Sequence, residues 1–295
     1  MYQKNITYKQ ARTEKLSVRE LLQKWLVPKK WQHFLRVEQN ILINGQYQAF
    51  NTIIKNNDLV TMNFDFDPRT SQHYLPGSGK LNVAYENDDL LVVNKPAGQK
   101  THPNLNSEDN TLFNDAESHL NKYGQHPYMV HRIDQETSGL VLISKTPYLV
   151  PIFNRQLSSK TLQREYLAIV DLKQPIENSG VIDQPIGLDP DDKRKRMVRT
   201  DGQNAKTEYH VISKNSKQAL LNLKLYTGRT HQLRVHLSHN GWPIVNDPLY
   251  NPQPQNGLLK LFAYKLIYQI PFTDLTKTVQ VDIPYFMKLD KETTN

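Results

Sequence analysis

The chain has 295 residues, enough for one large domain and one small one, and its composition, 38% hydrophobic and 22% charged, is ordinary for a globular protein. No apolar stretch approaches the roughly 20 residues that span a bilayer, and the first residues lack the apolar core of a signal peptide. The absence of cysteine excludes disulfides, thiolate chemistry and cysteine-type zinc sites. We therefore expect a cytoplasmic protein that has no membrane partner.

Most of the excess positive charge lies in the first quarter of the chain. The net charge is +8, and residues 1–70 hold 11 Lys and Arg against 6 Asp and Glu. Such a surface attracts a polyanion, and release of counterions from phosphates favours binding. This distribution predicts an RNA-holding module, although a small α+β subdomain with a solvated basic face would have the same composition.

This first segment has the pattern of two helices followed by short strands. Ser17 and Glu20 form a capping box before an apolar helical face, and a second helical pattern covers residues 30–39. Short β-type runs follow, broken by turn residues that begin at Asn44. Two basic helices and a small β unit resemble the S4-type RNA-binding domain, although the usual Arg-Leu-Asp opening is absent. We expect an S4-like domain over residues 1–70.

A segment rich in Pro, Gly and Ser, residues 71–80, is predicted to link this unit to a larger domain over residues 81–295. The larger domain opens with two strand-like runs, residues 81–86 and 90–94, joined by a polar turn.

The second run leads into an irregular loop, KPAGQKTHP, whose Pro and Gly residues prevent regular structure. Lys95, Lys100 and His102 give this loop a positive lining. Helical spacing then covers residues 110–123, with apolar side chains on one face.

The stretch VHRIDQETSGLVL, residues 130–142, places reactive side chains at the end of a predicted strand. His131, Arg132 and Asp134 follow one apolar run, and a Gly-containing polar turn leads to a second. Loops held by such scaffolds are where reactive groups usually sit. The local pattern alone favours a simpler role, in which Asp134 accepts hydrogen bonds from the backbone of its own turn.

The chain continues with a helical pattern over residues 147–157 and a β-type run over residues 161–170. From its spacing alone, Tyr166 in this run is a half-buried strand tyrosine. Residues 189–199, DPDDKRKRMVR, form a charged loop that is either a solvated surface or a contact for an RNA backbone.

The stretch TGRTHQLRVHL, residues 227–237, spans a predicted junction between a strand and a helix. Thr230 or the residue before it is predicted to cap the helix, which ends at Asn240. Arg229 then stands where a guanidinium can be aimed inward. Three histidines lie near this helix, but no carboxylate or cysteine shares their spacing, so we predict no metal site. The three are His231, His236 and His239.

Four of these stretches resemble the signatures of the large-ribosomal-RNA type (RluA/RluD type) of pseudouridine synthases, in the order of that family. They are KPAG with its following HP, HRIDQETSGL, the Arg-Glu-Tyr of residues 164–166, and TGRTHQLRVHL. Ile133 and Leu233 depart from the family pattern, and both are volume-conserving changes. One motif is a weak signal, whereas four in order are a strong one.

The resemblance implies an α+β fold with a mixed, largely antiparallel central sheet and flanking helices, beside the S4-like domain. It implies an enzyme that isomerises specific uridines to pseudouridine, most of all in 23S-type ribosomal RNA. It gives Asp134 the catalytic role and has Tyr166 stack on the target base.

The chemistry of this reaction is consistent with the residues present. A stacked uridine must be flipped out before an enzyme reaches its sugar. Asp134 is then a nucleophile at C1′ or a base at C2′, and the sequence does not choose between the two. We expect Arg229 to pair with Asp134 and keep it ionised. No step needs a redox group, so we expect no cofactor.

Six further side chains are expected to contact RNA, and we expect the enzyme to act as a monomer. They are His131, Arg132, Lys95, His102, His231 and Arg234. One alternative is an RNA-binding ribosome-assembly factor without catalysis, and another is an N-glycosidase that releases uracil. The combination of Asp134, Tyr166 and Arg229 argues against a pure RNA-binding protein, which has no need of all three.

Overall fold

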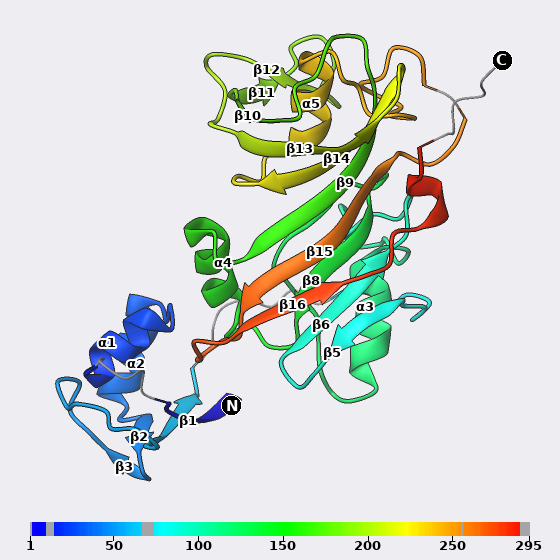
Figure 1. The fold of residues 1–295 in the computed structure, drawn as a ribbon. Helices are drawn as coiled ribbons and strands as arrows, with labels where there is room; N and C mark the ends of the chain where they lie inside the picture. The colour runs from blue at the N-terminus through cyan, green and yellow to red at the C-terminus, as the bar shows by residue number, and fades with distance from the viewer. Residues whose placement is uncertain (1, 10–14, 67–73, 255, 290–295) are drawn as a thin grey trace.

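The computed structural model describes residues 2–9, 15–66, 74–254 and 256–289, which form a small N-terminal sheet and a large central sheet (Figure 1). The small sheet is antiparallel, with strand order β1-β4-β2-β3, and two short helices accompany it. Its elements are β1 (Tyr2–Thr7), α1 (Val18–Lys24), α2 (Lys29–Val37), β2 (Ile41–Ile43), β3 (Gln46–Tyr47) and β4 (Leu59–Phe64).

The capping box predicted at the start of α1 is confirmed. The Ser17 side chain accepts a hydrogen bond from the Glu20 N–H, and the Glu20 carboxylate accepts one from the Ser17 N–H at 2.8 Å. Two otherwise unsatisfied N–H groups of the first turn are therefore bonded locally.

The large sheet has the strand order β10-β13-β14-β9-β15-β8-β6-β5, with β16 added beside β15 and β7 beside β8. In the described part of the chain, β8 and β15 are its only parallel neighbours. The expected mixed, largely antiparallel sheet is therefore confirmed. Its strands are β5 (Val83–Glu86), β6 (Leu90–Lys95), β7 (Tyr128–Met129), β8 (Ser138–Ser144), β9 (Gln163–Asp171), β10 (Ser179–Asp183), β13 (Lys206–Lys214), β14 (Gln218–Leu225), β15 (Leu261–Gln269) and β16 (Thr276–Gln280).

Helices flank this sheet, and a small hairpin lies beside α5, at the end of the sheet that carries β10 (Figure 1). The helices are α3 (Leu112–Asn121), α4 (Val150–Ser159), α5 (Gln232–His239) and a 3₁₀ turn (Tyr285–Met287), and the hairpin pairs β11 (Ile186–Leu188) with β12 (Arg196–Val198). No helix in the described ranges is long and apolar enough to cross a bilayer.

Two predicted helix starts are wrong. The helix expected from residue 147 begins at Val150, because a turn precedes it and Pro151 occupies the first helical turn. Thr230 does not cap α5. The residue before the helix is His231, whose φ of 57° is left-handed, and its side chain makes no capping hydrogen bond.

Gly139 lets β8 approach β15 closely. Its φ is +113°, and a Cβ at this position would lie 2.2 Å from the carbonyl oxygen of Ala263. Only glycine fits both restrictions. The Gly of the HRIDQETSGL motif is therefore required by the parallel pairing that positions the loop before it.

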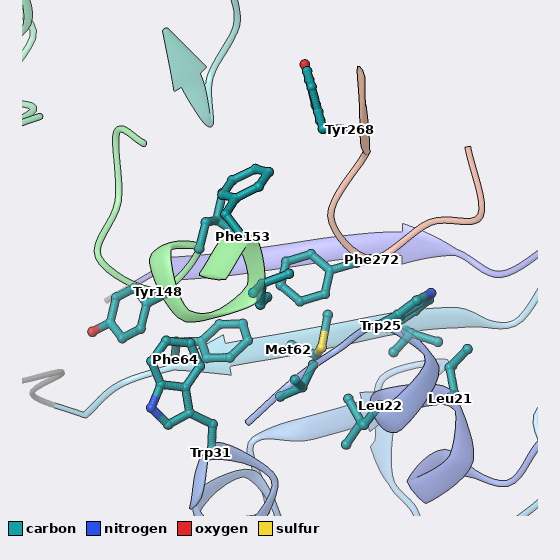
Figure 2. Packing of buried hydrophobic residues seen from close by; sticks show 14 of the residues in the cluster. Leu21, Leu22, Trp25, Trp31, Met62, Phe64, Tyr148, Phe153, Tyr268 and Phe272 are labelled. Carbon is teal, nitrogen blue, oxygen red and sulfur yellow. The ribbon is translucent and has the colours of Figure 1, made fainter. Parts of the chain in front are cut away.

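The N-terminal unit packs against the end of the large sheet, beside α4 and the turn between β15 and β16 (Figure 2). Ring centroids lie 5.9 Å apart for Trp25 and Phe272 and 5.5 Å apart for Phe64 and Tyr148. Contacts of this kind bury aromatic surface from both sides. The two units therefore share one continuous apolar core.

The predicted linker, residues 71–80, lies partly outside the described residues. Its described part, residues 74–80, has no helix or strand but is bonded to α3. The Gly77 N–H donates to the Asn114 carbonyl at 2.8 Å, and the Ser118 hydroxyl donates to the Gly77 carbonyl at 2.7 Å. The division into domains stays a prediction.

Candidate active site

The loop that carries Asp134 is held by the loop that follows β6. The Thr101 hydroxyl donates to the Ile133 carbonyl at 2.6 Å and accepts from the Ile133 N–H at 3.3 Å. The Gly98 N–H donates to the Gln135 carbonyl at 2.9 Å. Two motifs that are distant in sequence are therefore bonded on both sides of Asp134.

Lys95 also joins the loop after β6 to the Asp134 loop, through hydrogen bonds made in the protein interior. Its side chain is fully buried, and its ammonium donates to the carbonyls of Pro96, Gln99 and Gln135 at 2.8, 2.7 and 3.0 Å. Burial lowers the pKa of Lys95 to about 8. The donors of Lys95 are thus used within the protein, and the RNA contact expected for this residue stays a prediction.

His131 is buried as well. Its Nε2 accepts a hydrogen bond from the Leu142 N–H at 3.1 Å, so the imidazole supports β8. Burial, with the charge of Arg164 adding to it, lowers the pKa of His131 to about 3. A neutral, buried ring offers no charge to a phosphate, and the RNA contact expected for His131 stays a prediction.

Asp134 faces a guanidinium that is itself held by a second carboxylate. Asp134 Oδ2 lies 3.5 Å from Arg234 Nη1, while Arg234 donates from Nε and Nη2 to the two oxygens of Asp247 at 2.8 Å each. The side chains of Arg234 and Asp247 are 3% and 0% exposed, whereas that of Asp134 is 22% exposed. Arg234 therefore presents a fixed positive charge to a carboxylate that remains accessible.

This arrangement corrects the pairing expected for Arg229. The Arg229 side chain is exposed, and its Nε donates to the Asn204 carbonyl at 2.9 Å, while its N–H donates to Gln232 Oε1 at 3.0 Å. In the described part of the chain, the cation paired with Asp134 is Arg234. Arg234 contacts two carboxylates, and the RNA contact expected for it stays a prediction.

Tyr166 lies in the middle of the sheet. On β9 it pairs with Leu223 of β14 and Ala263 of β15, and its side chain is buried. Burial raises the pKa of the Tyr166 phenol, so it stays protonated at neutral pH. The ring is consequently a rigid aromatic surface, unlike the half-buried side chain that spacing alone indicates.

One pocket contains Asp134, Tyr166 and Arg229 in its wall, so the fold brings together the three side chains predicted to be catalytic. Its other charged and histidine residues are all basic: Arg132, Arg164, His231 and Arg234. A pocket with one carboxylate, one aromatic ring and several cations has the chemistry to receive an anionic nucleotide and act on its sugar.

Arg132 and His102 lie at the open side of this pocket. Arg132 is exposed, and its Nη1 is 2.8 Å from His102 Nε2. Both line a wider groove that also contains Lys100 and Arg194 and reaches Asp134. Their predicted RNA contacts are consistent with these positions and stay predictions.

Two site residues were missed by the sequence reasoning, Asp247 and Tyr250. Besides Asp247's contact with Arg234, the Tyr250 hydroxyl lies 2.8 Å from His231 Nδ1, and the guanidinium of Arg234 lies 5.0 Å from the centroid of the Tyr250 ring. The available signal was the short run NDPLY, in which an acid and an aromatic residue follow the helix.

Other polar residues of the last motif maintain the fold. Gln232 accepts from the Thr227 hydroxyl at 2.7 Å and donates to Thr207 Oγ1 at 3.0 Å. The two ring nitrogens of His236 each lie 2.9 Å from a partner, the Thr207 hydroxyl and the Gln184 carbonyl. No group of three or more His, Cys, Asp and Glu side chains in the described ranges could hold a metal ion.

A family model described as RNA pseudouridylate synthase matches residues 89–239, which include the pocket's motifs from Arg132 to Arg234. The chain belongs to the RNA pseudouridylate synthase family. It is therefore an RNA pseudouridine synthase, an enzyme that isomerises uridine to pseudouridine in RNA. A second model, described as the N-terminal domain of the RluD ribosomal pseudouridine synthase, matches residues 5–60.

Relatives in bacteria are similar over most of the chain. An uncharacterized RNA pseudouridine synthase of Bacillus subtilis, YhcT, is 36% identical over 257 residues, which are 85% of this chain and 83% of the relative. The ribosomal large subunit pseudouridine synthase D of Xanthomonas campestris is 39% identical over 194 residues, or 65% and 56% of the two chains.

Solved structures share the fold. The human RNA pseudouridylate synthase domain containing 4 aligns with a TM-score of 0.59 at 22% identity, covering 70% of this chain and 90% of the human one. The human RNA pseudouridylate synthase domain containing 1 aligns with the same TM-score at 24% identity, covering 72% and 89%.

Proposed function

We propose that this pseudouridine synthase modifies large-subunit ribosomal RNA, with Asp134 as its catalytic group. The relatives named for the large ribosomal subunit, and the match to the RluD N-terminal domain, support this substrate. The observation that carries the role of Asp134 is that this accessible carboxylate pairs with Arg234 and lines one pocket together with Tyr166.

The reaction needs no group beyond those in the pocket. A flipped uridine places its ribose at the Asp134 carboxylate and its base along the Tyr166 ring. The bond between N1 and C1′ breaks with Asp134 acting at C1′ or C2′, the freed uracil rotates, and a bond forms between C5 and C1′. The proton lost from C5 is balanced by the proton gained at N1, so the product is an isomer of the substrate.

Arg234 supports Asp134 as an oriented charge. Burial acts to lower the pKa of Arg234, but the hydrogen bonds that it donates to Asp247 and the charges of Asp247 and Asp134 raise it overall. The guanidinium therefore stays positive and, because Asp247 fixes its plane, needs no reorganisation while the Asp134 carboxylate reacts.

We also infer that RNA is held by the basic N-terminal unit and that one chain suffices for activity. The exposed cations Lys29, Lys30 and Arg36 of α2 offer a surface for phosphates. The pocket lined by Asp134, Tyr166 and Arg234 is complete within one chain. Action on ribosomal RNA would place the enzyme in the cytoplasm.

The test uses large-subunit ribosomal RNA transcribed with [5-³H]uridine, because forming the new bond at C5 releases tritium. We expect tritium release by the wild type and none by Asp134→Asn, with RNA affinity nearly unchanged. Asp191→Asn, which neutralises an exposed carboxylate outside the pocket, is the matched control and should retain the wild-type rate.

Three results would count against the proposal. Substantial single-turnover activity in Asp134→Asn would show that Asp134 is not the catalytic group. Tritium release from transfer RNA but not from ribosomal RNA would reject the substrate. Free uracil in the product would indicate hydrolysis of the glycosidic bond in place of isomerisation.

A further inference from the structure

A second hollow adjoins the pocket of Asp134 and is lined by four cations from separate parts of the chain. Arg132 comes from the Asp134 loop, Lys160 from the end of α4, Arg164 from β9 and Arg229 from the turn before α5. None of the described residues that line this hollow is an Asp or Glu. Positive charge is therefore concentrated at this hollow, and no carboxylate in its described lining neutralises it.

These four cations differ from others in the molecule. Arg194 pairs with Asp192, and Arg199 pairs with Asp201, each at 2.7 Å. In the part of the chain that the structure describes, none of the four forms an ion pair, and Arg164 Nε is a buried donor without a hydrogen-bond partner. A buried donor in this state is unfavourable until an acceptor reaches it.

The cations are also close to one another. Arg164 Nη2 would lie 3.1 Å from a Cβ at Gly228, so its guanidinium rests against the backbone beside Arg229. Burial lowers the pKa of Lys160, and the charges of Arg164 and Arg229 lower it further. Lys160 Nζ donates weakly, at 3.3 Å, to the Leu157 carbonyl. Mutual repulsion of this kind is relieved by a bound anion.

We propose that this hollow binds the phosphodiester group that flanks the target uridine. The inference rests on the proposed function. Arg132, Arg164 and Arg229 line both the hollow and the pocket of Asp134, so the two spaces are contiguous. A nucleotide whose base lies on Tyr166 therefore places a neighbouring phosphate among these cations. Guanidinium groups donate two parallel hydrogen bonds to phosphate oxygens, which fixes the nucleotide as well as attracting it.

The first test measures RNA affinity against salt concentration for the full-length protein, with the large-subunit ribosomal RNA transcript as the probe. Lys160→Gln removes one cation from the hollow, and Lys122→Gln removes one from the end of α3 as a matched control. Each phosphate contact contributes about 0.7–1 to the slope of log affinity against log salt. We expect Lys160→Gln to flatten the slope by about this amount, Lys160→Arg to restore it, and Lys122→Gln to leave it unchanged.

The second test locates the phosphate. Synthetic RNA around the mapped target uridine carries a neutral methylphosphonate on its 5′ or its 3′ side. We expect one of the two substitutions to weaken wild-type binding and to have little further effect on Lys160→Gln, because both changes remove the same contact. Additive losses at both positions would overturn the proposal.

The failures of the two proposals are distinguishable. A wild type that releases no tritium from ribosomal RNA would reject the proposed function, while the salt slopes would still test the hollow. Tritium release by the wild type, with identical slopes for Lys160→Gln and Lys122→Gln, would reject the phosphate site alone.

Discussion

Arg234 lies between two carboxylates, 3.5 Å from Asp134 at one amino group and hydrogen bonded to Asp247 through its other donors. Asp247 also accepts the N–H groups of Leu249 and Tyr250, at 2.9 and 3.1 Å. The orientation of the Asp247 carboxylate is thus set by these two backbone N–H groups. The position of the cation that faces Asp134 is therefore decided by a residue outside the pocket lining.

Asp247→Asn should consequently impair catalysis, although the Asp247 side chain does not line the pocket that receives the substrate. The substitution keeps the shape but leaves a buried cation with one charged neighbour, and breaking such a pair costs about 3–5 kcal/mol of unfolding free energy. We expect the single-turnover rate to fall by at least tenfold and RNA affinity by less than about threefold. Asp201→Asn removes the partner of an exposed arginine and should change stability by less than about 1 kcal/mol. Equal losses of rate and affinity would show that Asp247 acts on RNA binding.

Lys95→Met should loosen the Asp134 loop. The substitution leaves the carbonyls of Pro96, Gln99 and Gln135 without their buried donor, and we expect a loss of about 3 kcal/mol in denaturant unfolding. Turnover should fall while the salt dependence of RNA binding stays at the wild-type slope, because the ammonium does not reach phosphate. A flatter slope for Lys95→Met than for the wild type would show instead that the Lys95 ammonium contacts an RNA phosphate.

His131 should make the fold sensitive to acid. Its pKa is about 3 in the folded chain and about 6.5 when unfolded, so between these values the unfolded chain binds the extra proton. Stability is therefore lost as the pH falls below about 6.5, by up to about 1.4 kcal/mol per pH unit. His131→Gln, which keeps an acceptor for the Leu142 N–H, should lose roughly 2 kcal/mol less than the wild type between pH 6.5 and 4.5. Urea unfolding at both pH values measures this difference, and parallel losses in the two proteins would contradict it.

The basic face of α2 is best tested by charge removal. Cutting the chain after residue 80 would uncover Tyr148 and Phe272, which pack against aromatic rings of the N-terminal unit. We expect Lys29→Gln, Lys30→Gln and Arg36→Gln together to flatten the salt slope of RNA binding by up to about 3, at unchanged thermal stability.

The control removes the same charge at three exposed lysines near the hairpin of β13 and β14. They are Lys173, which follows β9, Lys214 at the end of β13, and Lys217 in the turn between β13 and β14, each changed to Gln. A slope that flattens equally in both triple variants would show that net charge, and not the α2 surface, holds the RNA.

Features that depend on neighbours in the chain could be predicted from the sequence. The capping box of Ser17 and Glu20, the strand runs on both sides of Asp134, and the end of α5 near Asn240 follow from residues a few positions apart. The family motifs likewise indicated the reaction, because they are contiguous stretches. Gly139 was visible as part of a motif, although its necessity became clear only from the backbone of β15.

The partner of Asp134 was decided by tertiary structure alone. Arg229 and Arg234 stand five residues apart in one motif, and their directions depend on where α5 begins. Because His231 is left-handed and the helix starts at Gln232, Arg234 turns inward to Asp247 while Arg229 turns out to the Asn204 carbonyl. The sequence supplied both cations, but only the packing of separate segments selects which charge is buried, since desolvation depends on atoms that are distant along the chain.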